Sequence, residues 1–381
     1  MLYFIFILLL ILILSIMLIG GAIYNLFKQE GFDSNGGDLK FYNKEDNKYR
    51  FRMDKLFNLK GPTSFTKIND NDNDMLITTK GGRVYYVSSI VKKADRQIKE
   101  IFNIKRERKD FTDEGSEEGL LGSTINPNNK SELFLSYTVK GTKRGFNTDV
   151  LVSKFELNSR NKDLSFIKNI IRVHFRKNFH HAGTIVYTGD NKLYLSTGDG
   201  GPQGDPHNTA QSDSLNGKLL EINPQSGKPT IIARGMRNPW KFTIDQDGRF
   251  FIGDVGWDSV ESIKLIENRN KEYNFGWSYF EGSKKNKSGK NFSGFDPPIF
   301  EYPKSKGSGA VVGGYYIEKL QLYIFGDYHG ILKALELRDN KWVQVANQNI
   351  DEKIYTFGYD GSNLFAGGEN SVYRIRPEKI K

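Results

Sequence analysis

A histidine and an adjacent arginine–asparagine pair are the side chains of this sequence best suited to chemistry. His180 lies in FHHAG, and Arg237 and Asn238 lie in ARGMRNPWKF, within a stretch from 180 to 282 that is rich in Gly, Asp and Asn turns. Such turns place polar groups at strand ends, where binding and catalytic groups usually lie. A histidine can take a proton near neutral pH, and a guanidinium can stabilise a developing oxyanion. Residues of these types could abstract a proton beside a fixed cation, but a structural histidine and an arginine in an ion pair are equally compatible with these residues taken by themselves.

The loop STGDGGPQGDP contains two aspartates, Asp199 and Asp205, in the most Asp- and Gly-rich part of the chain. Carboxylate oxygens in a tight loop are suitable ligands for Ca²⁺. Aspartates also cap local N–H groups in turns without any metal. The sequence leaves both alternatives open, a structural calcium site or a turn. A phosphate-binding loop is disfavoured because no helix-opening pattern follows the glycines.

The elements that must position these residues are short strands. One pattern recurs along the chain: a polar turn, a short apolar strand, and then a Gly or polar break. Its markers are Met75, Leu133, Leu193, Phe250, Leu322 and Leu364. Repeats of this length are typical of four-stranded blades that pack around a central channel. The six markers predict an all-β fold, a six-bladed β-propeller over residues 41–381.

The bulk composition agrees with a strand-rich fold. Of the 381 residues 13% are aromatic and 39 are Gly, which favours strands and tight turns over helices. The net charge is +10, but basic and acidic residues are interspersed as on an ordinary solvated surface, so no nucleic-acid partner is expected. The absence of cysteine excludes disulfides and thiolate metal sites.

The N-terminal residues 1–27 carry no charged side chain. This run is long enough to cross about 30 Å of hydrocarbon as a helix. A cleaved signal peptide, the alternative, would have a basic first region and a shorter apolar core. We therefore predict a single-pass transmembrane anchor over 1–27 and a linker over 28–40. The predicted location of the propeller is the extracytoplasmic side of a membrane, or a virion membrane.

Nine motifs, in order, resemble the soluble glucose and aldose sugar dehydrogenases that use pyrroloquinoline quinone (PQQ), the glucose/sorbosone dehydrogenase family. Hedgehog-interacting proteins share their domain. The resemblance covers roughly residues 45 to 378. The motifs are EEGLLGSTINP (117–127), HHAG (180–183), STGDGGPQGDP (196–206), SLNGKLLEINP (214–224), ARGMRNPWKF (233–242), GDVGWDSVESI (253–263), NFGWSYFEG (274–282), GGYYI (313–317) and FGDYHG (325–330).

The resemblance implies an aldose sugar dehydrogenase that oxidises the anomeric hydroxyl of a sugar to the lactone. Together with the anchor predicted over 1–27, this gives a membrane-anchored dehydrogenase. His180 matches the family's catalytic base, and Arg237 matches the residue that polarises the quinone carbonyl. Asn238 and Glu117 match residues that line the cofactor site. Gly256 and Trp257 match the pair whose backbone carbonyls hold the cofactor-bound Ca²⁺. The aromatic residues expected to stack on the sugar are Trp277, Tyr279 and Tyr302.

The sequence departs from the family pattern at the positions that anchor the acidic quinone. Tyr328 or His329 stands where the glucose enzyme has a lysine, and Lys353 is the only cation near the position of its arginine pair. A tricarboxylate such as PQQ needs compensating positive charge. The alternative function is a non-catalytic propeller that binds a protein or glycan partner. A Ca²⁺-dependent lactonase is disfavoured because no ordered Glu/Asn/Asp set for a central metal stands out.

Overall fold

A computed structural model describes residues 47–68, 73–286, 292, 294–304 and 309–380. The chain separates into two compact units, Met1–Glu45 and Asp46–Lys381. The predicted anchor (1–27) and linker (28–40) lie outside the described residues, so both remain predictions. None of the helices in the described ranges has the length and apolar character needed to span a bilayer.

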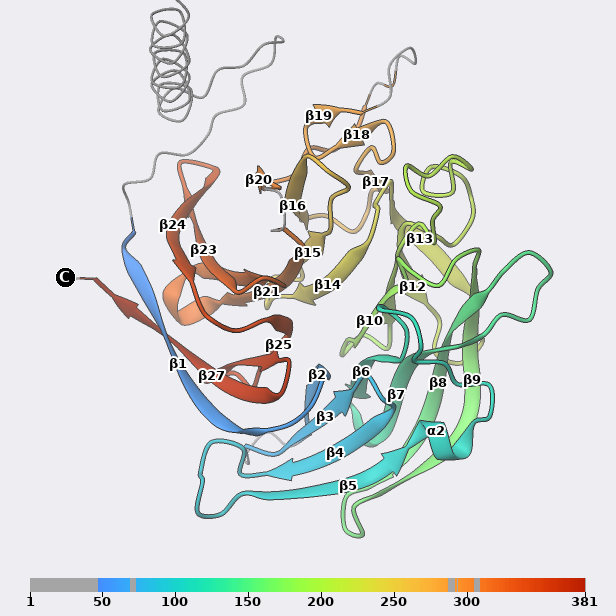
Figure 1. Ribbon diagram of the computed structural model, residues 1–381, viewed down its shortest axis with the longest axis vertical. Coiled ribbons are helices and arrows are strands. Elements are labelled where there is room, and N and C mark those ends of the chain that lie inside the picture. Colours follow the sequence, from blue (N-terminus) through green and yellow to red (C-terminus); the bar gives the residue numbers. More distant parts are fainter. Residues whose placement is uncertain (1–46, 69–72, 287–291, 293, 305–308, 381) are drawn as a thin grey trace, which may run out of the picture. The chain divides into compact units, whose positions relative to one another are not determined.

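Six sheets of four or five strands form the blades of the second unit (Figure 1). Blade 1 consists of β2 (Pro62–Lys67), β3 (Met75–Thr79), β4 (Arg83–Ser88) and β5 (Gln97–Asn103). Blade 2 consists of β6 (Leu120–Asn126), β7 (Asn129–Lys140), β8 (Thr148–Asn158) and β9 (Asp163–Phe175). Blade 3 consists of β10 (Ala182–Tyr187), β11 (Leu193–Thr197), β12 (Lys218–Ile222), β13 (Pro229–Arg234) and the short β17 (Tyr273–Asn274).

The remaining three blades follow the same order. Blade 4 consists of β14 (Pro239–Ile244), β15 (Phe250–Asp254), β16 (Val260–Ile266) and β20 (Phe300–Pro303). Blade 5 consists of β21 (Val311–Ile317), β22 (Leu322–Asp327), β23 (Ile331–Arg338) and β24 (Lys341–Asn349). Blade 6 consists of β25 (Ile354–Tyr359), β26 (Leu364–Gly368), β27 (Ser371–Lys379) and β1 (Tyr49–Asn58). Outside the blades lie α2 (Ile104–Glu107), η1 (Glu318–Leu320) and the hairpin of β18 (Phe280–Glu281) and β19 (Lys284–Lys285).

The first strands of the six blades form a closed inner ring. Strands β2, β6, β10, β14, β21 and β25 each contact the next, and β25 returns to β2. All six sequence markers lie on the second strand of their blade and are buried. The predicted six-bladed all-β propeller is thus confirmed for the described part of the chain.

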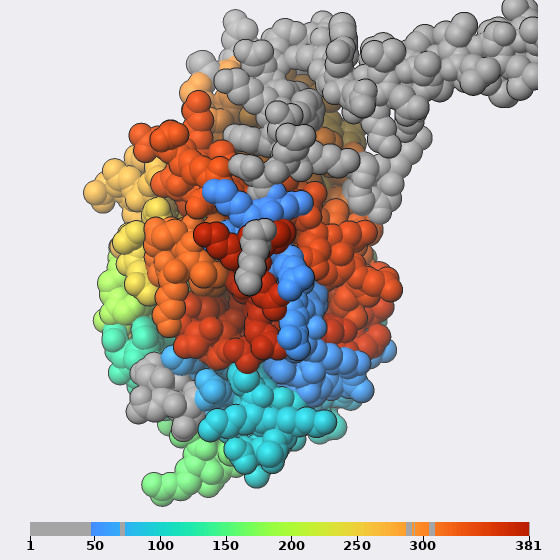
Figure 2. Space-filling view, turned by 90° about the vertical axis from the view of Figure 1, so that its left-hand side faces the viewer, coloured from blue at the N-terminus to red at the C-terminus, as the bar shows by residue number. Residues whose placement is uncertain are grey.

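The ring is closed by strands from opposite ends of this unit. Strand β1 pairs antiparallel with β27, from Tyr49 opposite Lys379 to Asn58 opposite Ser371. Figure 2 shows the blue N-terminal strand lying against the red C-terminal blade. Because blade 6 draws one strand from the N-terminal side, the ring cannot open at this blade without breaking a full ladder of backbone hydrogen bonds.

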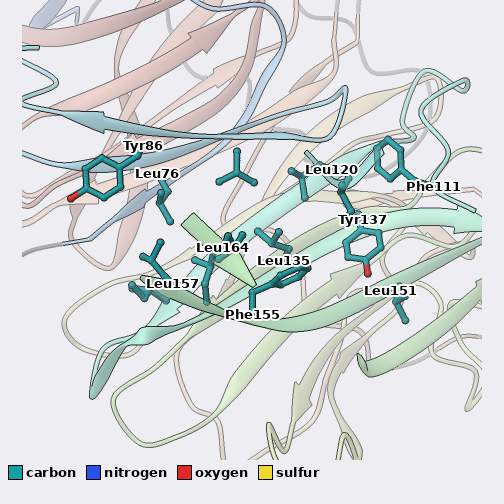
Figure 3. Close-up of a cluster of buried hydrophobic side chains, with 14 of the residues drawn as sticks. Leu76, Tyr86, Phe111, Leu120, Leu135, Tyr137, Leu151, Phe155, Leu157 and Leu164 are labelled. Carbon is teal, nitrogen blue, oxygen red and sulfur yellow. The ribbon is translucent and has the colours of Figure 1, made fainter. Parts of the chain in front are cut away.

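Apolar side chains between neighbouring blades form the core. Figure 3 shows the cluster between blades 1 and 2, in which Leu76 and Tyr86 face Leu135 and Phe155. Each strand presents alternate side chains to opposite faces, and each blade face is covered by a neighbouring blade. Full burial of one such side chain stabilises the fold by about 1.5–3 kcal/mol.

The antiparallel pairing of the first two strands determines where functional residues collect. Ala182 at the start of β10 lies opposite Thr197 at the end of β11, and Pro239 lies opposite Asp254 in the same way. Residues just before a first strand and just after a second strand therefore lie at the same end of the ring. We call this the site end.

Candidate active site

His180 lies at the site end, immediately before β10, and its side chain is only 4% exposed. Its Nδ1 is 2.7 Å from Oδ1 of Asp199, which follows β11. The carboxylate of Asp199 is itself fixed by two further donors. The indole Nε1 of Trp277 donates to Oδ2 at 2.8 Å, and the Gly201 amide donates to Oδ1 at 2.9 Å.

This pairing sets the protonation pattern of the imidazole. A carboxylate accepts hydrogen bonds, so Asp199 holds the proton of neutral His180 on Nδ1 and leaves the lone pair on Nε2. Across the described ranges no group hydrogen-bonds to Nε2 of His180. The arrangement can take a proton from a bound hydroxyl at Nε2. The role of His180 as catalytic base stays a prediction.

The backbone of His180 is held in a left-handed conformation by its neighbours. Its φ is +56°, and its amide donates to Oε2 of Glu117 at 2.7 Å. The same carboxylate oxygen accepts Nδ2 of Asn238 at 3.1 Å. Opposite, Gly198 leaves no room for a side chain, because a Cβ there would lie 2.1 Å from the His180 carbonyl oxygen. Glu117, His180 and Asn238, all predicted site residues, are thus brought together.

Arg237 and Asn238 lie directly before β14 and are positioned by a buried carboxylate. Asp254 Oδ1 accepts the amide of Arg237 at 3.1 Å and that of Asn238 at 2.8 Å. The charge of Asp254 is balanced by Lys264, whose Nζ lies 2.5 Å from Oδ2. Asp254 thus fixes the backbone of Arg237 and Asn238 and leaves both of their side chains available for other contacts.

The guanidinium of Arg237 has no carboxylate partner among the described residues. It donates to the Val255 carbonyl oxygen at 3.1 Å and to Oε1 of Gln203 at 2.9 Å, and it lies 5.8 Å from the Trp277 ring centroid. Arg237 therefore does not form a structural ion pair with any described residue, which was the alternative left open by the sequence. Its buried Nε and the buried Oδ1 of Asn238 have no hydrogen-bond partner in the described part of the chain.

The turn after β15 carries the predicted calcium ligands. Oε1 of Glu281 accepts the amides of Trp257, Asp258 and Ser259 at 2.7–2.9 Å, which organises the turn. The carbonyl oxygen of Gly256 accepts Nζ of Lys304 at 3.0 Å.

The ammonium of Lys304 also forms an ion pair. It lies 3.1 Å from Oε1 of the fully buried Glu261. Burial raises the pKa of Glu261 to about 7, and the Lys304 charge opposes that rise. An ammonium therefore bridges a backbone carbonyl and a buried carboxyl group at this turn.

The Asp-rich loop after β11 is organised by hydrogen bonds within the protein. Oδ1 of Asp205 accepts the Thr209 amide at 2.8 Å, and Oδ2 accepts the Ala210 amide at 2.9 Å. The buried Nζ of Lys218 donates to three carbonyl oxygens of the loop, and burial lowers its pKa to about 7. No cluster of three or more His, Asp or Glu residues arranged for a metal occurs in the described ranges. These contacts match the turn alternative; a calcium ion on Asp199 and Asp205 remains a prediction.

Aromatic residues at the site differ from those expected to stack on a sugar. Trp277 and Tyr302 are 2% and 9% exposed, and the Tyr302 hydroxyl donates to Asp327, so neither presents an open ring. Tyr279 stacks on Phe292. Trp257 is 38% exposed and packs edge-on against Trp277. The sugar-stacking role assigned to Trp277 and Tyr302 is therefore wrong, because both rings belong to the packed support of the site.

Residues 59–325 match the family model described as Glucose / Sorbosone dehydrogenase. The chain belongs to this family. Among curated relatives, the HIPL1 protein of Arabidopsis thaliana is 28% identical, over 47% of this chain and 34% of its own length. The chain therefore spans only about a third of that relative.

Solved structures agree on the fold. The soluble aldose sugar dehydrogenase of Escherichia coli, in its apo form, matches with a TM-score of 0.70 at 19% identity. The match covers 87% of this chain and 100% of the Escherichia coli chain. The PQQ-bound aldose sugar dehydrogenase of Streptomyces coelicolor has a TM-score of 0.66 at 18% identity and covers 86% of this chain and 99% of its own. At this identity the likeness establishes the propeller fold.

For a member of the glucose/sorbosone dehydrogenase family, the donor set fits a quinone in one respect. Buried polar atoms are normally hydrogen-bonded, and the Nε of Arg237 and Oδ1 of Asn238 have no partner among the described residues, so a polar group of a ligand or a water could bond to them. Calcium on the Gly256 carbonyl fits poorly, because the Lys304 ammonium binds that oxygen and would place a like charge beside the ion.

The predicted cofactor residue Tyr328 brings no charge to the site. It follows β22 at the site end, and its ring lies 5.4 Å from that of Tyr355. Lys353 lies 5.7 Å from the centroid of the Tyr328 ring and forms an ion pair with Glu369 at 3.5 Å. Within the described residues, the cations that the turn after β15 holds for an acidic cofactor are Arg237 and Lys304.

Proposed function

We propose that this chain is an aldose sugar dehydrogenase that oxidises the anomeric hydroxyl of a sugar to the lactone, with PQQ as the electron acceptor. The observation that carries the proposal is the His180–Asp199 pair, which leaves one imidazole nitrogen free at the same end of the ring as Arg237, whose guanidinium has no carboxylate partner among the described residues. Membership of the glucose/sorbosone dehydrogenase family supports this class of reaction.

The chain's own residues supply proton transfer and charge. Nε2 of His180 takes the proton of the anomeric hydroxyl, and Asp199 stabilises the imidazolium that forms. Bound PQQ would supply the chemistry of hydride acceptance. Arg237 and Asn238 would hold it, and the guanidinium would stabilise negative charge on a carbonyl oxygen. Trp277 keeps Asp199 dry and oriented, which fixes the direction of the free nitrogen.

The test is a calorimetric titration of PQQ into the full chain, followed by dye-linked oxidation of a panel of aldoses. We expect binding and turnover, and turnover should be lost in His180→Ala while PQQ binding is kept. Absence of PQQ binding to the folded wild-type chain would refute the proposal.

A second candidate function is a non-catalytic propeller that binds a protein or glycan partner. The observation that favours it is the neutral Tyr328 at the position of the family lysine, with Lys353 already paired to Glu369. The same titration separates the two, because a recognition propeller would bind no quinone. Anchoring of either form to a membrane through residues 1–27 also stays a prediction, which alkaline extraction of membranes from the source cells would check.

A further inference from the structure

Two cations bind consecutive carbonyl oxygens on the turn after β15. Arg237 donates to the oxygen of Val255 at 3.1 Å, and Lys304 donates to that of Gly256 at 3.0 Å. The two residues flank different strands of blade 4, since Arg237 precedes β14 and Lys304 follows β20. The turn thus collects two positive charges at the place where the family resemblance puts a calcium ion.

Among the described residues, the Lys304 ammonium contacts oxygen atoms of two kinds. The Gly256 oxygen is a neutral carbonyl, and Oε1 of Glu261 belongs to a buried carboxyl group 3.1 Å away. The other oxygen of Glu261 accepts the amides of Gly256 and Val311, so the carboxyl group cannot turn away. Carbonyl and carboxylate oxygens are also the ligands that Ca²⁺ prefers. The ammonium therefore occupies two oxygen donors of the kind that Ca²⁺ binds.

The backbone holds Lys304 at this position. Its amide donates to the Ser259 carbonyl oxygen at 2.9 Å, on the same turn. The side chain is 23% exposed, so its charge is partly desolvated and still accessible to a ligand at the site end. A partly buried ammonium acts more strongly on a neighbouring charge than one in water.

We propose that the ammonium of Lys304 takes the place of the calcium ion at the Gly256 turn and provides, with Arg237, the fixed positive charge for an anionic ligand. The identity of the anionic ligand rests on the proposed function. The exclusion of calcium by Lys304 is independent of it. A Ca²⁺ ion would have to lie about 2.3–2.6 Å from the same carbonyl oxygen and share Glu261 with a like charge. The site consequently works without calcium.

The experiment measures calcium binding to the full chain by thermal unfolding and by terbium luminescence excited through tryptophan, since Trp257 lies on the same turn. The variants are Lys304→Met, which removes the charge, and Lys304→Gln, which keeps a hydrogen-bond donor in case the first variant does not fold. The matched control is Lys284→Met, because Lys284 donates to the Ser259 hydroxyl of this turn at 3.1 Å without contacting Gly256.

We expect no saturable Ca²⁺ effect on wild type or Lys284→Met at millimolar concentration. Lys304→Met or Lys304→Gln should gain a saturable effect in the range of about 10–100 µM, typical of a moderate oxygen-ligand site. Saturable calcium binding by wild type would overturn the inference. The inference would also be overturned if both Lys304 variants fold but neither binds calcium. The ammonium would then not be the reason why wild type binds no calcium.

Titration of PQQ in the presence of a calcium chelator tests the ligand part separately. Wild type and Lys284→Met should bind equally, and Lys304→Met should bind at least about 10-fold more weakly, as expected for loss of one charge-assisted contact. If wild type binds no PQQ under any condition but the calcium results hold, the proposed function fails and the replacement of calcium by Lys304 stands. If wild type binds PQQ only with calcium, the replacement fails and the proposed function stands.

Discussion

The site end has two functional corners, one at His180 and one at Gly256. They are built from similar backbone positions but would perform different chemical tasks. At the His180 corner one carboxylate, Asp199, orients a neutral imidazole and leaves a single nitrogen free. At the Gly256 corner two backbone carbonyls hold two cations, Arg237 and Lys304. The effect of these charges does not depend on the orientation of a single atom. Proton transfer depends on one atom in one place, whereas electrostatic stabilisation is shared among charges. The first corner should therefore be the more sensitive to substitution.

The largest effect is expected from His180→Asn. Loss of the general base should lower kcat for aldose oxidation by about 10³-fold, with PQQ binding unchanged. The matched control is His174→Asn, because His174 forms the same contact with a carboxylate, Asp149, at 2.7 Å on β9. Steady-state dye-linked assays should show the control within about twofold of wild type. Equal losses in both variants would show that the contact is structural.

At the second corner, Arg237→Met should lower kcat by about 10²-fold, the typical cost of removing one donor to a developing oxyanion. The effect should be smaller than that of His180→Asn because the Lys304 charge remains. Arg249→Met is the control, since Arg249 pairs with Asp245 and covers the Phe251 ring away from the site. An Arg237→Met loss larger than that of His180→Asn would reverse the proposed division between the corners.

Much of this arrangement could be predicted from the sequence. The strand markers identify the six blades, and the motifs around His180, Arg237 and Asn238 mark residues that the fold does bring together. The link from His180 to Asp199 could have been found as well, because antiparallel pairing of β10 and β11 places their flanking residues side by side.

Lys304 could not be found in this way. It follows the outer strand of blade 4 and reaches the Gly256 turn through tertiary contacts that no local pattern encodes. Likewise, Trp277 and Tyr302 were expected to be open to a sugar because a sequence does not show which aromatic rings the blades bury. Side-chain burial and long-range partners depend on packing between blades, whereas turns and strand spacing are local.

A more selective test of the His180 corner is Asp199→Asn. The amide can donate to Nδ1, which would leave the imidazole proton on Nε2 and remove the base. We expect a loss in kcat of about 10- to 100-fold, smaller than that of His180→Asn because a fraction of molecules keeps the productive tautomer. Asp149→Asn, which changes the pair with His174, is the control. Full activity in Asp199→Asn would mean that orientation by the carboxylate is not needed.

The smallest effect on activity is expected at Lys241, whose ammonium is held by carbonyl oxygens across the channel. Its Nζ donates to the oxygens of Thr63 and Leu121, and burial lowers its pKa to about 7 from an ordinary 10.5. Between these pH values the unfolded chain binds a proton that the folded chain has released, so the free energy of unfolding rises with pH. Below about pH 7 both states are protonated and this gain is lost.

Lys241→Met should therefore abolish a rise of a few kcal/mol in the free energy of unfolding between about pH 7 and pH 10. Urea denaturation of wild type and variant at both pH values measures it, and kcat should change little. A flat difference between the two proteins across this window would contradict the lowered pKa. It would also indicate that the carbonyl pair keeps Lys241 charged.

The central claim is that the free nitrogen of His180 takes the sugar proton, and single-turnover kinetics test it most directly. The PQQ-loaded chain is mixed rapidly with an aldose, and reduction of the bound quinone is followed by absorbance, in wild type, His180→Asn and His174→Asn. We predict fast reduction in wild type and His174→Asn, and reduction slowed by about 10³-fold in His180→Asn. Reduction at the wild-type rate in a folded, PQQ-loaded His180→Asn chain would contradict the account.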